Sequence, residues 1–289
     1  MPRPRSLLAG LLLLLTGCGP ALLSGADSLS RFSPPPPRVA TGVAYGEEPR
    51  QKLDVYAPKG DAESGARPVV VFFYGGAWAE GARGGYAFAG RAFASKGFVT
   101  VVPDYRLVPQ VRFPAFVQDG AAAIRWVRDN ISKYGGDPNR ITIAGHSAGA
   151  HIGAMLALDR RWLQEAGVDP KTIRAGALLA GPYDFLPLTD RRSSAALGNW
   201  PRPEETQPLT FARADAPPLW LATGTLDKVV RPRNSEVLAR RLRSFGAPAE
   251  FKQYQGAGHT DLALGLAKPF RGRLPVLDDA ATFLQANSR

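Results

Sequence analysis

The sequence predicts an α/β fold in which about eight strands form a mostly parallel sheet, with helices on both faces and a small cap. Two observations predict it: short apolar runs alternate with helical patterns along most of the chain, and glycine or proline turns separate them. With 289 residues, 45% of them apolar, the chain can bury one large core. We therefore expect a single folded domain over residues 39–289.

The elements follow from three local patterns. Continuous apolar runs such as residues 69–73 are typical of strands covered on both faces. Apolar residues at helical spacing predict helices, and Gly97 marks the end of one. The predicted strands are 43–45, 53–56, 69–73, 98–102, 141–144, 177–179, 219–223 and 250–254, the first two as an antiparallel pair. The predicted helices are 86–96, 114–134, a helix after residue 147, 232–245 and 275–286.

The N-terminus has the pattern of a targeting signal. Two arginines precede an apolar core over residues 7–15, shorter than the ~20 residues that a spanning helix needs. The following Leu15-Thr16-Gly17-Cys18 resembles the bacterial lipobox, whose cysteine is acylated. This implies a signal peptide over 1–17, lipidation of Cys18, a proline-rich tether over 18–38 and a lipid-anchored location in the cell envelope, at the outer membrane if there is one. An ordinary secretory signal with an incidental cysteine is the alternative.

Composition excludes several classes of protein. The net charge is +11, but the arginines are scattered and no nucleic-acid module is recognisable, so we expect no nucleic-acid binding. A basic surface also suits an anionic membrane. A single cysteine excludes an intramolecular disulfide and a cysteine-based metal site, and three histidines argue against a zinc site, so we expect no metal and no cofactor. Nothing in the sequence indicates the oligomeric state.

A candidate nucleophile stands where an apolar strand meets a helix. Gly145-His146-Ser147-Ala148-Gly149 fits the G-x-S-x-G pattern, in which a serine occupies a strained strand-to-helix turn. Its neighbours must be small so that strand and helix can approach. The alternative is a tight packing turn between strand and helix whose serine has no catalytic role.

The serine needs a base, and three histidines are available. His146 is adjacent to Ser147, so its side chain should point away from the serine oxygen. His151 lies inside the following helix, where packing or a structural hydrogen bond is expected. His259 lies in a glycine-flanked loop directly after the last predicted strand, and we interpret it as the base.

The base in turn needs a carboxylate. Asp227 follows a predicted strand, and the order Ser147, Asp227, His259 matches that of α/β-hydrolases. Asp184 also follows a strand and competes for this role, but we expect it at the pocket rim. Asp261 is too close in sequence to His259 to reach its ring.

The stretch "FFYGGAW" completes a resemblance to serine carboxylesterases of the α/β-hydrolase fold, in the hormone-sensitive-lipase-like branch. That branch includes feruloyl and acetyl-xylan-esterase-like proteins, isoprenylcysteine methylesterases and kynurenine formamidases. The resemblance implies an oxyanion hole made by the backbone N–H groups of Gly76, Ala77 and Ala148. Tyr74 stands where the family usually has histidine, and Trp78 is expected to pack.

The resemblance implies hydrolysis of small or medium carboxylic esters through an acyl-enzyme on Ser147. Two alternatives stay open. One is an amidase, formamidase or peptidase that uses the same three side chains. The other is a catalytically silent, anchored binding protein.

Overall fold

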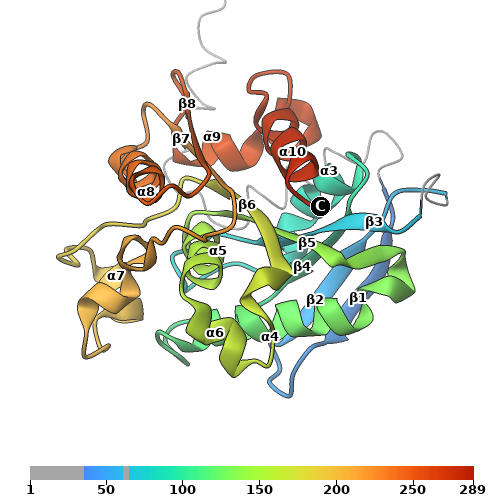
Figure 1. Cartoon of the computed structure of the whole chain (residues 1–289), viewed down its shortest axis with the longest axis horizontal. Helices are drawn as coiled ribbons and strands as arrows, with labels where there is room; N and C mark the ends of the chain where they lie inside the picture. The colour runs from blue at the N-terminus through green and yellow to red at the C-terminus, as the bar shows by residue number, and fades with distance from the viewer. Residues whose placement is uncertain (1–35, 61–64) are drawn as a thin grey trace, which may run out of the picture.

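The structure is a computed structural model that describes residues 36–60 and 65–289. Its centre is an eight-stranded sheet in the order β1-β2-β4-β3-β5-β6-β7-β8 (Figure 1). The strands are β1 (Arg38–Ala44), β2 (Lys52–Tyr56), β3 (Arg67–Phe73), β4 (Val99–Pro103), β5 (Gly136–His146), β6 (Ile173–Leu179), β7 (Leu219–Gly224) and β8 (Ala249–Tyr254). β2 runs antiparallel to both of its neighbours, and the pairs from β4 to β8 are parallel. The predicted fold class is confirmed.

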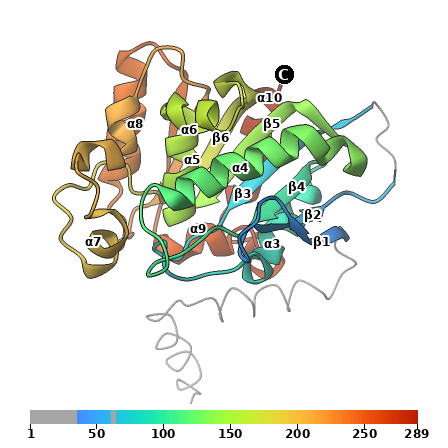
Figure 2. The ribbon, with the colours of Figure 1, turned by 90° about the horizontal axis from the view of Figure 1, so that it is seen from below.

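Helices cover both faces of this sheet. They are α3 (Ala87–Ala94), α4 (Ala115–Asn130), α5 (Ala148–Leu158), α6 (Arg160–Glu165), α7 (Arg191–Leu197), α8 (Arg233–Ser244), α9 (His259–Leu264) and α10 (Val276–Ala286). Helices α4, α5 and α6 pack against one another on one face, while α3 contacts α10 on the other (Figure 1). Seen from below, α4 lies across the near side of the strands (Figure 2).

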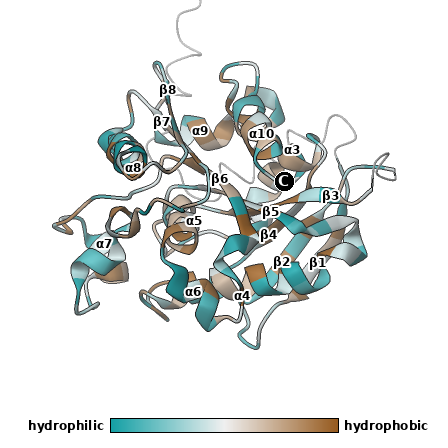
Figure 3. Cartoon of the chain, in the orientation of Figure 1, coloured by the Kyte–Doolittle hydropathy of each residue, from teal (hydrophilic) through white to brown (hydrophobic). Residues whose placement is uncertain are grey.

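The core is the inner sheet between these helix layers. Every residue of β4 and β7 is buried, which explains why both strands are apolar apart from one threonine each, Thr100 and Thr223. Helix α8 has the opposite character: one stripe is buried and the rest is polar, so it is largely teal in Figure 3. Apolar burial therefore runs through the inner strands of the sheet, while α8 presents its charged side chains outward.

Several boundaries differ from the predicted ones. β5 begins at Gly136 rather than 141, because its polar first half carries no apolar signal. Helix α4 ends at Asn130 and continues as a 3₁₀ turn to Tyr134. His259, predicted in a loop, is the first residue of the short helix α9. The predicted signal peptide over 1–17, Cys18 and the tether as far as residue 35 lie outside the described residues, and Arg38, predicted as the end of the tether, is the first residue of β1.

The turn after β5 is closely packed. A Cβ atom on Gly149 would lie 2.1 Å from the carbonyl oxygen of Phe73 and 2.4 Å from that of Tyr74, both fixed backbone atoms. A Cβ on Gly145 would lie 2.7 Å from the carbonyl oxygen of Gly149. Only glycine fits at these two positions, so helix α5 can start directly against β3 and β5.

We expect Gly149→Ala to lower the free energy of unfolding by about 3 kcal/mol or more, because backbone cannot move aside as a side chain can. Gly153→Ala in the same helix is the matched control. Its Cβ would meet only side-chain ends, that of Leu178 at 3.0 Å and that of Ile143 at 3.5 Å. Alanine also favours a helix by up to about 1 kcal/mol, so this change should be nearly neutral. Urea unfolding compares the two, and equal stabilities would contradict the packing argument.

Candidate active site

Ser147 occupies the strained turn between β5 and α5. Its φ of 55° and ψ of −123° are unusual for a residue with a side chain. The turn is held by a hydrogen bond from the Ser147 N–H to the carbonyl of Leu179, at 2.9 Å. The serine therefore stands at the N-terminus of an eleven-residue helix, where the helix dipole is positive.

Three side chains from distant segments form one hydrogen-bonded chain. Nε2 of His259 lies 2.9 Å from Oγ of Ser147, and its Nδ1 lies 2.8 Å from Oδ2 of Asp227. The other oxygen, Oδ1, accepts the N–H groups of Val229 and Val230 at 2.9 and 2.8 Å. The Asp227 side chain is fully buried, and that of His259 is 11% exposed. The structure thus brings together the three residues singled out by sequence.

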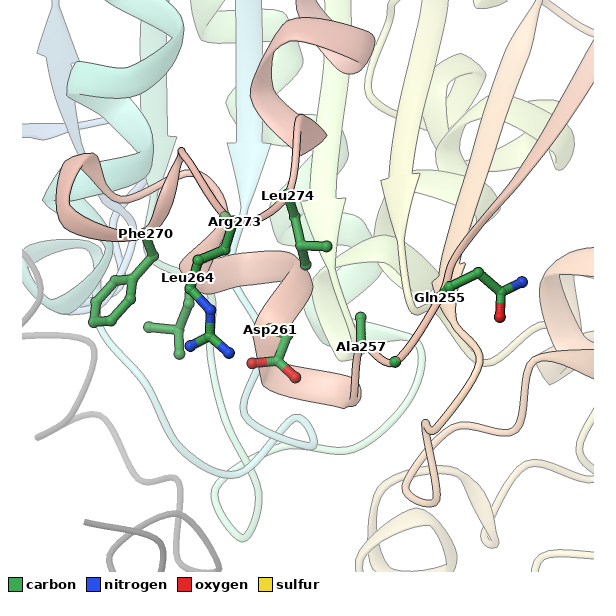
Figure 4. Close-up of a pocket in the computed structure, with 9 residues that line it drawn as sticks. Gln255, Ala257, Asp261, Leu264, Phe270, Arg273 and Leu274 are labelled. Carbon is green, nitrogen blue, oxygen red and sulfur yellow. The ribbon is translucent and has the colours of Figure 1, made fainter. Parts of the chain in front are cut away.

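The competing carboxylates lie elsewhere. Asp184 is partly exposed and forms an ion pair with Arg233 at 2.8 Å. Asp261 accepts the N–H of Gly258 at 2.7 Å, which fixes the start of α9. It also lines a cavity of about 170 Å³ beside α9 (Figure 4), which none of the three bonded side chains lines. Neither carboxylate bonds to the His259 ring.

His146 has a structural role that sequence reasoning missed. It is buried, and its Nε2–H donates to the backbone carbonyl of His259 at 3.0 Å. The two imidazole rings lie 4.8 Å apart. Burial, and then the neighbouring His259, lower the pKa of His146 to about 3, so the ring is neutral. Nothing in the spacing of the sequence identifies this contact, because its partner is 113 residues away.

The loop after β3 passes beside the serine. A Cβ on Gly75 would lie 3.0 Å from Cβ of Ser147. Gly76 has a φ of 137°, Ala77 one of 49°, and the carbonyl of Gly76 accepts the N–H groups of Ala79 and Glu80. Within the described residues, the N–H groups of Gly76 and Ala77 donate to no other backbone group.

Ala148 adds a third donor to this region. It is the first residue of α5, so its N–H has no partner within the helix. Donors of this kind can bind a developing oxyanion if they converge beside the serine. Gly76, Ala77 and Ala148 are the three residues to which the family resemblance assigned an oxyanion hole.

Tyr74 fixes the base of this loop. Its buried hydroxyl donates to Asp104 at 2.9 Å and accepts from Arg50 at 2.9 Å. Arg50 also donates to the carbonyl of Gly81 at 2.8 Å, and the N–H of Arg83 donates to Asp104 at 2.7 Å. Burial, and then Asp104, raise the pKa of Tyr74 well above its usual value, so the hydroxyl keeps its proton. These contacts join both ends of the loop to β4.

The segment between β6 and β7, which contains α7, extends to one side of the sheet (Figure 1) and is tied to the core. Nε2–H of buried His151 donates to the carbonyl of Thr206 at 2.8 Å. Buried Trp78 contacts the His151 ring edge-on at 5.1 Å and stacks on Phe185 at 6.3 Å. Burial lowers the pKa of His151 to about 4. His151 and Trp78 thus have packing roles, as expected from the sequence.

The described residues contain neither a cluster of metal-ligating side chains nor a membrane-spanning helix. Across residues 36–60 and 65–289, no group of three or more His, Cys, Asp or Glu residues is arranged to hold a metal ion. Within the same ranges, none of the helices combines the length and the apolar character that crossing a membrane requires.

A serine on a strained strand-to-helix turn, bonded through histidine to aspartate on this sheet, defines the α/β-hydrolase class. A sequence profile described as BD-FAE matches residues 53–242. The chain belongs to the BD-FAE family, within the hormone-sensitive-lipase-like α/β-hydrolases.

Curated relatives and solved structures agree with this family. The probable isoprenylcysteine alpha-carbonyl methylesterase ICMEL1 of Oryza sativa subsp. japonica is 34% identical over 86% of this chain and 63% of its own length. Esterase LipC of Mycobacterium tuberculosis is 32% identical over 75% and 58%. The chain thus spans slightly less than two thirds of these relatives. Thermogutta terrifontis esterase 2 superposes with a TM-score of 0.73 at 26% identity, covering 88% of this chain and 95% of its own. Its solved forms include one with bound butyrate and one phosphonylated by sarin.

We expect the protein to lose stability as the pH falls below about 6.5, because His146 and His151 stay neutral when folded but take up protons when unfolded. The unfolded chain then binds more protons, which favours unfolding. Between pH 7.5 and 5.5, each histidine should contribute about 1.4 kcal/mol to this loss. Urea unfolding at the two pH values measures it. His151→Gln should remove about half of the pH dependence, and an unchanged dependence would contradict the assignment.

Proposed function

We propose that this protein is a serine hydrolase that cleaves carboxylic esters through an acyl-enzyme on Ser147. The observation that carries the proposal is the hydrogen-bonded chain Ser147–His259–Asp227, with distances of 2.9 and 2.8 Å. The named esterase and methylesterase relatives support the reaction class.

In this mechanism His259 is the general base. Asp227 accepts a hydrogen bond from Nδ1–H of His259, so the neutral ring carries its proton on Nδ1. Nε2 is therefore free to accept the proton of Ser147. Nε2 takes the proton of Ser147 as Oγ attacks the ester carbonyl, and Asp227 stabilises the imidazolium that forms. His259 then returns the proton to the leaving alcohol, and water repeats the steps on the acyl-enzyme.

The tetrahedral intermediate carries a negative charge on the former carbonyl oxygen. The N–H groups of Gly76, Ala77 and Ala148 are the donors that we assign to it. Support comes from the short approach of the loop to Ser147 and from the unpartnered N–H groups described above. The reaction needs no metal and no cofactor.

We place the substrate among small or medium esters. The butyrate-bound form of the Thermogutta esterase supports a short acyl chain. A series of p-nitrophenyl esters from acetate to dodecanoate, with matched anilides, tests this choice. Faster cleavage of the anilides would favour the amidase alternative. A folded wild type that cleaves none of them and resists a fluorophosphonate probe would favour the silent binding protein.

We expect Asp227→Asn to lower kcat by several orders of magnitude, since the same change in a serine-protease triad costs about 10⁴. Asp184→Asn is the matched control and should cost far less, because Asp184 pairs with Arg233 at the surface. The measurement is the kcat of ester hydrolysis by the two purified aspartate variants. Ser147→Ala should abolish both ester hydrolysis and labelling by the fluorophosphonate probe. The reverse ranking of the two aspartates would overturn the assignment.

Tyr74→Phe should reduce kcat less than tenfold, which is about 1.4 kcal/mol of transition-state stabilisation. The change keeps the ring stacked on Tyr105 at 4.7 Å and removes only the hydroxyl that anchors the loop. Stability should fall by about 1–2 kcal/mol. Loss of a true oxyanion donor costs about 10²–10³ in kcat. A loss of that size in a folded variant would mean that Tyr74 contacts the reacting group.

We also propose that the enzyme is a lipoprotein of the bacterial cell envelope, anchored through Cys18, with the catalytic domain on the periplasmic or outer side. The support is the sequence Leu15-Thr16-Gly17-Cys18 after a short apolar core. A multiply acylated cysteine holds a protein firmly, whereas attraction between charges is screened by salt.

Wild-type protein should therefore stay with membranes through a high-salt wash, and Cys18→Ser should release it with its esterase activity intact. Fractionation with mass spectrometry of the N-terminal peptide is the measurement. A soluble wild type, or an N-terminal peptide without lipid, would leave simple secretion as the explanation.

A further inference from the structure

A second charged cavity lies away from the proposed catalytic residues. It has a volume of about 230 Å³ and lies where β6 begins and the chain approaches β7. Its charged lining consists of Arg160, Lys171, Arg174, Arg213, Arg289 and Asp215. Five cationic side chains thus surround one carboxylate.

Arg213 is held in place before any ligand arrives. Its guanidinium donates to the carbonyls of Leu158 and Ala157 at 3.1 and 2.9 Å, and to Asp215 at 2.9 Å. The side chain is only 21% exposed. Arg160 and Arg213 both contact Asp215, so the two cations lie close together. Burial, and then the charge of Arg160, lower the pKa of Arg213. An anion between them would relieve this repulsion.

The nearby carboxylates do not neutralise the cavity. Asp215 is shared between Arg160 and Arg213. Asp159 is occupied by Arg161, and Asp169 accepts the backbone N–H of Lys171 at 2.8 Å. Lys171, Arg174 and Arg289 form no ion pair with any of the described residues. Three cations are therefore available to a ligand.

We propose that this cavity binds a phosphate-bearing anion. A phosphate monoester or a pyrophosphate carries more than one negative charge and several acceptor oxygens, which suits a cluster of guanidinium groups and one ammonium group. A single carboxylate would leave most of these cations unpaired. Two sources fit this requirement: a free phosphate compound, whose charges lie on one molecule, and an anionic lipid surface, where several singly charged phosphodiester headgroups lie side by side.

The site is remote from the catalytic chain. Arg174 lies near the start of β6 and Leu179 at its end, five residues or roughly 17 Å further along the strand, where its carbonyl accepts the N–H of Ser147. Helix α6, which begins at Arg160, and α9, which begins at His259, lie on different sides of the molecule in both Figure 1 and Figure 2. The bound anion therefore does not enter the ester reaction, and this inference does not depend on the proposed function.

The test is a calorimetric titration of the purified full chain with inorganic pyrophosphate at low and at physiological salt. Lys171→Gln with Arg174→Gln should weaken binding at least tenfold. Both side chains are exposed, so folding should persist, and an unchanged urea-unfolding midpoint should verify it. Lys59→Gln with Arg240→Gln is the matched control, because it removes the same two residue types from exposed positions outside the cavity. The control should bind within twofold of wild type.

A second measurement distinguishes the sources of phosphate. The Cys18→Ser chain is sedimented with vesicles of phosphatidylglycerol or of phosphatidylcholine. If the chain binds phosphatidylglycerol vesicles but not phosphatidylcholine vesicles, and loses this binding in the Lys171→Gln, Arg174→Gln variant, the site takes a lipid headgroup. If pyrophosphate binds and neither kind of vesicle does, the site takes a free phosphate compound. The proposal is overturned if neither probe binds, or if the control variant loses as much affinity as the cavity variant.

Discussion

The close approach of α5 to β3 and β5 is the constraint on which the rest of the site depends. Gly149 lies so near the carbonyls of Phe73 and Tyr74 that no side chain fits there. This approach forces the chain to turn within one residue, and Ser147 takes the strained backbone conformation at that point. The same packing carries the loop with Gly76 and Ala77 past the serine. One steric requirement thus places the nucleophile and its candidate oxyanion donors together.

The remaining parts of the site come from loops that fixed hydrogen bonds hold in place. Asp227 is oriented by two backbone N–H groups, and the start of α9 by Asp261, so both partners of the histidine–aspartate bond are set before a substrate binds. Tyr74, Arg50 and Asp104 do the same for the loop after β3. Such preorganisation means that little reorganisation has to accompany the development of charge.

Local pattern was enough to predict the sheet, Ser147 and His259, because strand, turn and helix signals are short-range. The choice of Asp227 over Asp184 also needed the order of the three residues along the chain, since both aspartates follow a strand. Helices α6 and α7 were missed, since six or seven residues are too few to show helical periodicity. Their only local signals are Asp159 and Asp190, whose side chains accept backbone N–H groups at the helix starts. The contact of His146 with His259 and the bond of Arg50 to Tyr74 join distant segments, and no local signal encodes them.

The buried neutral state of His146 has an electrostatic consequence for the proposed mechanism. When His259 becomes an imidazolium, a second positive ring 4.8 Å away would oppose it by roughly 3 kcal/mol at the effective dielectric constant of a protein. That would cancel much of the stabilisation provided by Asp227. Burial keeps His146 neutral while its Nε2–H still holds the backbone of His259. The residue before the nucleophile can therefore position the base without competing for its proton.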